Sequence, residues 1–116
     1  MAQKYIKDDI VMYDYRIHTI IDTIGLNNYE LSYVRHPVNQ TELSGVPLTY
    51  EILEKNGWEH KDDVYFKDYP QRKLVIYDDK AYIINESCSL FLCKVEFVHQ
   101  LQHLLFGLGL NLEMEV

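Results

Sequence analysis

The last two dozen residues constrain the fold of this chain more than any other stretch. Cys93–Phe97 has the composition of a strand, Val98–Leu108 has the period of an amphipathic helix, and Gly109 interrupts that period. Apolar residues three and four positions apart stack on one helical face. This face is formed by Val98, Leu101, Leu105 and Leu108, and the flank beside it by His99, Gln102, His103 and Phe106.

The chain then ends on a two-residue alternation. Leu112, Met114 and Val116 alternate with Glu113 and Glu115, which predicts a half-buried closing strand. A helix and strand of this kind need a sheet to lie on, so the preceding residues must supply one.

The N-terminal part predicts a small antiparallel, barrel-like β-subdomain. After a frayed lead-in (residues 1–8), Ile, Val, Tyr and Thr are frequent in three segments, and Gly25–Asn28 has turn composition. The predicted strands are Asp9–Asp14, Tyr15–Ile24 and Tyr29–Val34. Pro, Asn, Ser and Gly then predict that Arg35–Gly45 is a loop and the boundary between an N-terminal and a C-terminal half.

A short helix is predicted after this loop. Thr49 can cap its N-terminus, and Asn56-Gly57 can end it. Trp58 stands where a Schellman-type cap returns an apolar side chain to Leu53.

A β-meander follows this helix, with an Asp78–Lys80 turn in its clearest hairpin. Its predicted strands are Val64–Asp68, Lys73–Tyr77, Ala81–Asn85 and Ser89–Phe97. The expected fold class is therefore α+β, with the C-terminal helix across the meander and the last strand on its edge. We expect a single domain over 1–116, with possible sub-domains at 1–45 and 46–116.

Composition narrows the function classes. The net charge of −7 argues against nucleic-acid binding, which needs clustered Lys and Arg. No apolar run reaches the roughly 18 residues of a membrane span, and the first residues lack a secretory signal, so we expect a cytoplasmic protein without a membrane partner. Cys88 and Cys93 are expected to be buried free thiols.

The sharpest chemical motif is His99-Gln-Leu-Gln-His103. Two histidines at positions i and i+4 of a helix can share a metal, as in zinc proteases. Here Gln100 stands where those enzymes carry the glutamate that acts as general base, and Gln cannot accept the proton. A third ligand from His18, His36 or His60 is conceivable, but no spacing indicates one. We therefore predict flank histidines that form hydrogen bonds, with no catalytic, cofactor-binding or metal residue and no cofactor.

Ten tyrosines are many for a domain of this length. Tyrosine is a good strand residue whose hydroxyl reaches water at the rim of a sheet. It also gives a large contact area with few torsions to freeze, which suits a binding surface. Both interpretations are open at this point.

Two segments resemble a group of small proteins encoded by phages and mobile elements of gut bacteria. Residues 47–58 resemble the group's P-L-T-x-E-x-L-x-K-x-G-F/W element, and residues 97–105 resemble its V-H-Q-L-Q helix. Where members often open a small β-barrel with Leu-Arg-Ile-Gly-Asn, this chain has Tyr5–Asp9. The resemblance covers residues 46–116 and implies a phage or mobile-element origin; it supplies no catalytic residue.

We therefore expect a non-enzymatic accessory protein that binds another protein and forms a homo-oligomer, most simply a dimer. Interference with a host system, including counter-defence, is a role consistent with the origin that the resemblance implies. One alternative is a sponge for a small molecule or nucleotide signal, which would need clustered Arg, Lys or His residues. Another is a metal-dependent hydrolase that uses His99 and His103.

Overall fold

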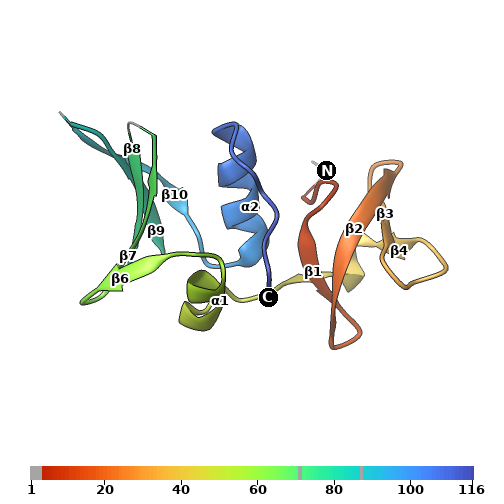
Figure 1. The fold of residues 1–116 in the computed structure, drawn as a ribbon. Helices are drawn as coiled ribbons and strands as arrows, with labels where there is room; N and C mark the ends of the chain where they lie inside the picture. Colours follow the sequence, from red (N-terminus) through yellow and green to blue (C-terminus); the bar gives the residue numbers. More distant parts are fainter. Residues whose placement is uncertain (1–3, 71, 87) are drawn as a thin grey trace. The chain divides into compact units, whose positions relative to one another are not determined.

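The computed structural model describes residues 4–70, 72–86 and 88–116. It divides the chain into two compact units: unit 1 consists of Met1–Pro47 and Phe97–Glu113, and unit 2 of Leu48–Glu96 and Met114–Val116. Each unit contains an antiparallel sheet and one α-helix (Figure 1). The fold class is therefore α+β, as predicted. The chain leaves unit 1 after Pro47 and returns to it at Phe97, so unit 1 is built from two separate segments.

The sheet of unit 1 contains the three predicted N-terminal strands. In the order β4-β3-β2-β1-β5, its strands are Val38–Asn39, Asn28–Leu31, Arg16–Ile24, Ile10–Tyr13 and Ser44–Gly45. The pairing Ile10↔Thr19 sets the register of the first hairpin. In the described residues the sheet is open, with β4 and β5 at its edges, so the barrel-like closure was wrong.

The segment predicted as a loop contributes to this sheet. Besides β4 and β5 it contains a 3-10 turn, η1 (Gln40–Glu42), closed by a capping box in which Asn39 and Glu42 bond each other's backbone. A local box of this kind satisfies the backbone groups of so short an element. Its residue types are also loop formers, which is why composition alone indicated a loop.

The core of unit 1 reaches into the lead-in. Tyr5 is fully buried and its ring lies edge-on to that of Tyr29, 5.7 Å away. The expectation of a frayed lead-in was therefore wrong for this part of it, while residues 1–3 lie outside the described residues. The buried cluster comprises Tyr5, Val11, Ile20, Tyr29, Leu31, Val38 and Leu43.

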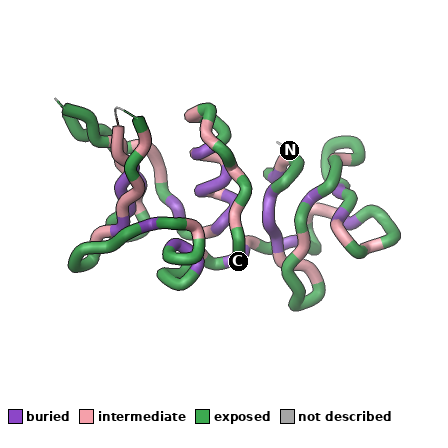
Figure 2. Tube along the Cα trace, in the orientation of Figure 1, coloured by how far each residue is buried: buried purple, intermediate pink, exposed green. Residues whose placement is uncertain are grey.

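Helix α2 (Val98–Gly107) has nearly its predicted bounds and belongs to unit 1. There it packs against β1, whereas we predicted that it would lie across the meander. Val98, Leu101 and Leu105 of the predicted apolar stripe are buried, whereas Leu108, the C-cap, is only half-buried. Figure 2 shows buried segments along α2. His99 and Gln102, predicted for the flank, are also buried. The Gln102 amide accepts a hydrogen bond from the Ile10 N–H, whereas the His99 ring packs edge-on to Tyr5 and its buried Nδ1 has no hydrogen-bond partner among the described residues.

The sheet of unit 2 is the predicted meander with one more strand. In the order β10-β9-β8-β7-β6, its strands are Ser89–Lys94, Lys80–Ile84, Arg72–Tyr77, Val64–Tyr69 and Glu59–Lys61. The hairpin of β8 and β9 pairs Ile76 with Ala81 across a two-residue turn of Asp78 and Asp79. Both aspartates have positive φ, which is the conformation that such tight hairpins require.

Helix α1 (Tyr50–Lys55) begins and ends at the predicted residues. The Thr49 hydroxyl accepts a hydrogen bond from the Ile52 N–H at 3.3 Å. At the other end, the Trp58 N–H donates to the Leu53 carbonyl and the Gly57 N–H to that of Glu54, which is the Schellman pattern. Gly57 has a φ of +84°, and Trp58 is buried, so the predicted cap is confirmed.

The end of the chain is extended but forms no strand in the described residues, so the closing strand was wrong. Burial nevertheless alternates as predicted: Leu112, Met114 and Val116 are half-buried and the residues between them exposed. In unit 2 the Asn56 amide replaces a strand partner. Its Nδ2 donates to the Glu115 carbonyl at 2.7 Å, and its Oδ1 accepts from the Glu115 N–H at 2.8 Å.

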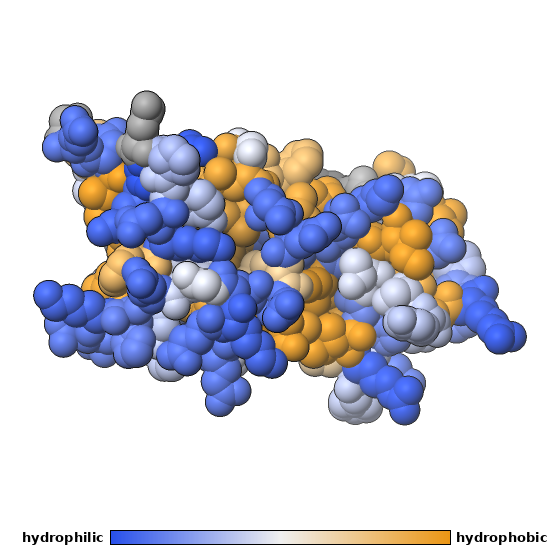
Figure 3. Space-filling model, in the orientation of Figure 1, coloured by the Kyte–Doolittle hydropathy of each residue, from blue (hydrophilic) through white to orange (hydrophobic). Residues whose placement is uncertain are grey.

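Both cysteines are free, but Cys88 is exposed and Cys93 only half-buried, so the expected burial of both was wrong. Burial raises the pKa of the Cys93 thiol. Hydrophilic residues cover much of the visible face, with hydrophobic patches between them (Figure 3). In the described ranges, neither helix is long and apolar enough to cross a bilayer.

Candidate functional site

The histidine pair of α2 lies side by side, as its spacing predicts. His99 in the first turn is 4% exposed, and its ring stacks on Phe97 and meets Tyr5 edge-on. Gly45 makes this packing possible, since a Cβ there would lie 2.7 Å from the Phe97 ring and 3.0 Å from His99 Cε1. The His103 ring lies one turn further along, 5.7 Å from that of His99.

Asp9 is the partner of His103 that sequence reasoning missed. His103 Nε2 lies 2.6 Å from Asp9 Oδ2, and the Ile6 N–H donates to the same oxygen at 2.9 Å. The Asp9 side chain is completely buried, whereas that of His103 keeps 34% of its surface. In the sequence Asp9 stands in an Asp-Asp pair at a strand start, where an exposed turn residue is the ordinary expectation.

The remaining histidines do not join this pair. His18 Nδ1 contacts the Ser32 carbonyl oxygen, His36 Nδ1 contacts that of Pro37, and His60 lies in unit 2. Within the described part of the chain, no three or more His, Cys, Asp or Glu side chains are grouped so that they could hold a metal ion. The polar cluster of Tyr5, Asp9, His99, Gln102 and His103 instead joins the lead-in, β1 and α2 inside unit 1.

The electrostatics of this cluster follow from its burial. Burial lowers the pKa of the His99 imidazole from 6.5 to about 4, against the opposing charge of Asp9. Burial and the Asp9 charge also raise the pKa of the Tyr5 phenol. His99 is therefore neutral at pH 7.

A pH dependence of stability is expected from His99. The folded pKa of His99 lies below its unfolded value, so between pH 6.5 and 4 the unfolded chain binds more protons than the folded one. The free energy of unfolding therefore decreases as the pH is lowered through this range. The loss approaches about 3 kcal/mol below the folded pKa. Urea unfolding at pH 7 and 4.5 should show a smaller loss in His99→Gln than in the wild type. Parallel pH profiles would contradict this assignment, as would an NMR titration of His99 with a midpoint near 6.5.

A pocket of about 200 Å³ is the second candidate site, and it lies within unit 2. Its apolar wall is formed by Leu48 and Leu53 around α1, Ile76 on β8 and Val95 after β10. Carboxylates come from the two turns that flank this wall: Asp63 between β6 and β7, and Asp78 and Asp79 between β8 and β9. None of the described lining residues is Lys, Arg or His.

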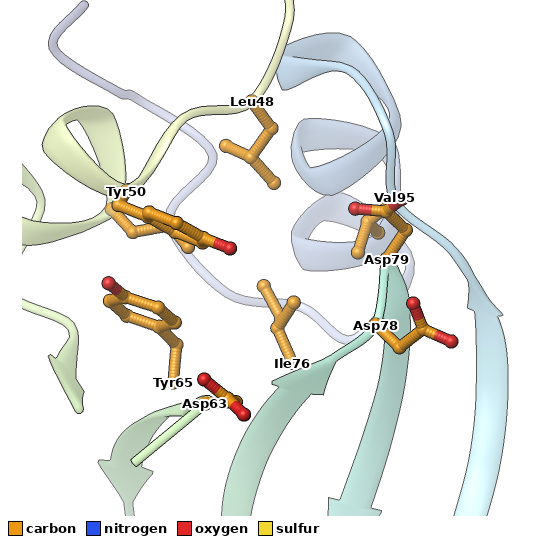
Figure 4. A pocket seen from close by; sticks show the side chains of 9 residues that line it. Leu48, Tyr50, Asp63, Tyr65, Ile76, Asp78, Asp79 and Val95 are labelled. Atoms are coloured by element: carbon orange, nitrogen blue, oxygen red, sulfur yellow. The ribbon is translucent and has the colours of Figure 1, made fainter. Parts of the chain in front are cut away.

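Aromatic rings form one side of the pocket. Tyr50 stacks on Tyr65 with ring centroids 5.1 Å apart and planes at 11°. His60, which does not line the pocket, stacks against Tyr65 at 5.2 Å. Figure 4 shows the Tyr50 hydroxyl directed towards the space that Leu48, Ile76 and Asp79 border. The arrangement offers carboxylate and hydroxyl oxygens above an apolar surface.

The sequence predicts the turn at Asp78-Asp79 but not this pocket. Asp62-Asp63 and Asp78-Asp79 are hydrophilic pairs about fifteen residues apart, and only the register of the meander brings the two turns to one end of the sheet. Tyr50 and Tyr65 are two of the ten tyrosines, for which the sequence leaves a strand role and a binding role open. Compared with protein-family models, curated proteins and solved structures, the chain matches none of them.

Proposed function

We propose that the protein is a non-enzymatic binding module that acts by contact with other proteins, including a second copy of itself. The observation that carries this proposal is a row of apolar side chains across four strands of the unit 2 sheet. This row contains three aromatic side chains and one valine and is here called the aromatic row. It consists of Phe66, Val75, Tyr82 and Phe91.

The register places the aromatic row on one face of the sheet. Phe66 pairs with Val75, Val75 with Tyr82, and Tyr82 with Phe91, and directly paired residues point to the same side. Phe91 is 52% exposed, and its ring meets that of Tyr82 edge-on at 5.6 Å. Tyr77 and Ile84, also exposed, continue the same face.

The row ends at β10, an edge of the described sheet. An edge strand presents unpaired N–H and C=O groups, and pairing with a second copy satisfies them. Aromatic side chains are enriched in protein interfaces, whereas Lys and Glu are depleted. Two copies that pair along β10 join their aromatic rows into one surface, in a two-fold dimer that buries on the order of 1,200–2,000 Å².

The dimer is tested by light scattering at micromolar concentration. We expect a dimer for the wild type and a tenfold or greater weakening of self-association in Phe91→Ser, because the change removes an aromatic side chain from the contact. Phe106→Ser is the matched control, since Phe106 is 61% exposed but lies on α2 of unit 1. A monomeric wild type, or equal effects of the two changes, would refute this part of the proposal.

A protein partner has more support than an anionic signal molecule. Arg16 and Arg35 lie in unit 1 and Arg72 in unit 2, and the described pocket holds carboxylates where a phosphate ligand would need cations. A hydrolase built on His99 and His103 has less support as well, because His103 Nε2 already contacts Asp9.

The setting is also part of the proposal. The likeness to mobile-element proteins suggests interference with a host system, including counter-defence. The unpaired state of Cys88 and Cys93 fits a reducing cytoplasm. A pull-down from host lysate tests this, with Phe91→Ser as the comparison; a host protein retained by the wild type and lost by the variant is the expected result. Equal recovery of the host protein by the wild type and the variant would show that host binding does not use the aromatic row.

A further inference from the structure

The pocket of unit 2 combines an apolar wall with carboxylates, and a ligand that matches both is an amphipathic cation. We propose that it binds an alkyl cation, meaning an ammonium or guanidinium group at the end of a methylene chain. The source is either a Lys or Arg side chain of a partner protein or a free alkylamine. This inference goes beyond the dimer, because the aromatic row occupies the opposite face of the sheet: Tyr65 and Ile76, which line the pocket, each precede or follow a residue of that row.

The size of the pocket suits a single side chain. Its volume of about 200 Å³ is below the roughly 300–1,000 Å³ of pockets that take drug-sized ligands. Leu53, Ile76 and Val95 are at most 6% exposed, so the wall that they form is fixed by packing in unit 2. A methylene chain on this wall removes apolar surface from water, as the stems of Lys and Arg do elsewhere in proteins.

The charge of the pocket selects a cation. Asp78 forms an ion pair with Lys80 at 3.8 Å, whereas Asp63 and Asp79 form no ion pair with any described residue. A cation among these carboxylates gains charge-assisted hydrogen bonds, to which the Tyr50 hydroxyl adds a further acceptor. A neutral or anionic ligand of the same shape gains no ionic attraction to these carboxylates.

The backbone of Asp79 is fixed before any ligand arrives. Its backbone has a φ of +60° in the tight turn between β8 and β9, and its carbonyl accepts the Val95 N–H at 2.7 Å. That bond ties the acidic turn to a wall residue of the pocket. A preformed site loses less conformational entropy on binding than one that must be ordered.

The test follows the methyl signals of Leu53, Ile76 and Val95 by NMR during titration of the full chain. The probes are n-butylammonium, n-butylguanidinium and the neutral 1-butanol. We expect saturable shifts with both cations, at least tenfold weaker binding of butanol, and weakening of cation binding as salt is added. Equal binding of butanol and the cations, or no saturable shift at these methyl groups, overturns the proposal.

Matched variants locate the charge. Asp63→Asn/Asp79→Asn should weaken cation binding at least tenfold, because it removes two carboxylates while Asn tolerates positive φ. Asp62→Asn, a change in the same turn as Asp63 but outside the pocket, should bind as the wild type does. Unchanged binding in the double variant, with its thermal unfolding intact, overturns the proposal.

Two further arms separate the ligand sources and the two proposals. Tighter binding of N-acetyl-lysine-N-methylamide than of 1,4-diaminobutane supports a protein side chain, and the reverse order supports a free amine. Phe91→Ser should retain cation binding even where it loses self-association. A loss of cation binding in that variant would contradict the independence of the pocket from the dimer.

Discussion

Replacing His103 with alanine is expected to lower the free energy of unfolding by about 1–3 kcal/mol, the range for leaving a buried polar group without its hydrogen-bond partner. Asp9 is completely buried, and its Oδ2 receives His103 Nε2 at 2.6 Å. Without the imidazole, a buried carboxylate retains only the Ile6 N–H as a donor in the described chain. Urea unfolding of the variant and the wild type measures the loss.

A double-mutant cycle separates the pair from packing around it. Asp9→Asn replaces the carboxylate by an amide of nearly the same shape, so Asp9→Asn/His103→Ala should lose clearly less than the sum of the single changes. Additive losses would mean that the two side chains do not interact energetically. A His103→Ala loss below about 1 kcal/mol would show that water replaces the imidazole without penalty.

The histidine pair illustrates what local spacing can and cannot predict. Two residues four positions apart on a helix must lie on neighbouring turns, and the rings of His99 and His103 do so. The role of His103 depends on Asp9, which is 94 residues away in the sequence. Since no local pattern connects them, the motif predicted flank histidines but could not identify Asp9 as the partner of His103.

The elements that the sequence predicted well are those decided by neighbouring residues. The Thr49 cap, the Schellman end at Gly57 and the turn at Asp78-Asp79 each need only a few adjacent residues of the right type. The apolar stripe of α2 is local in the same sense. The sheet against which it packs is not, and for this reason the helix was assigned to the meander rather than to β1.

The pocket was out of reach of sequence reasoning for a related reason. Two of the pocket residues, Asp63 and Asp79, are ordinary turn aspartates. Three others, Leu53, Ile76 and Val95, are ordinary core residues, so no residue type marks the pocket. Only the pairing of β7 with β8 and the return of the chain after β10 bring them around one space. Register, rather than residue type, creates this candidate site.

Gln102 has a role that neither its residue type nor its position on α2 predicted. Its Oε1 accepts the Ile10 N–H at 2.8 Å, and its Nε2 donates to the carbonyls of Asp8 at 2.9 Å and Leu112 at 3.2 Å. One amide, 1% exposed, thus joins the start of β1, helix α2 and the end of unit 1. All three partners are backbone groups, so only the orientation of the amide makes the contacts specific.

Replacing the buried Gln102 with leucine should therefore destabilise the protein, although leucine is an apolar residue that suits a buried position. It keeps most of the side-chain volume but leaves the Ile10 N–H and two carbonyls without their partner, at about 1–3 kcal/mol for each group that stays buried. We expect a loss of about 3 kcal/mol or more in urea unfolding, with faster amide exchange at Ile10. Gln100→Leu is the matched control two residues earlier, where the amide accepts the Phe97 N–H as a helix cap worth about 1 kcal/mol. Equal losses in the two variants, or a Gln102→Leu protein as stable as the wild type, would show that water replaces these bonds and that packing alone holds α2 on β1.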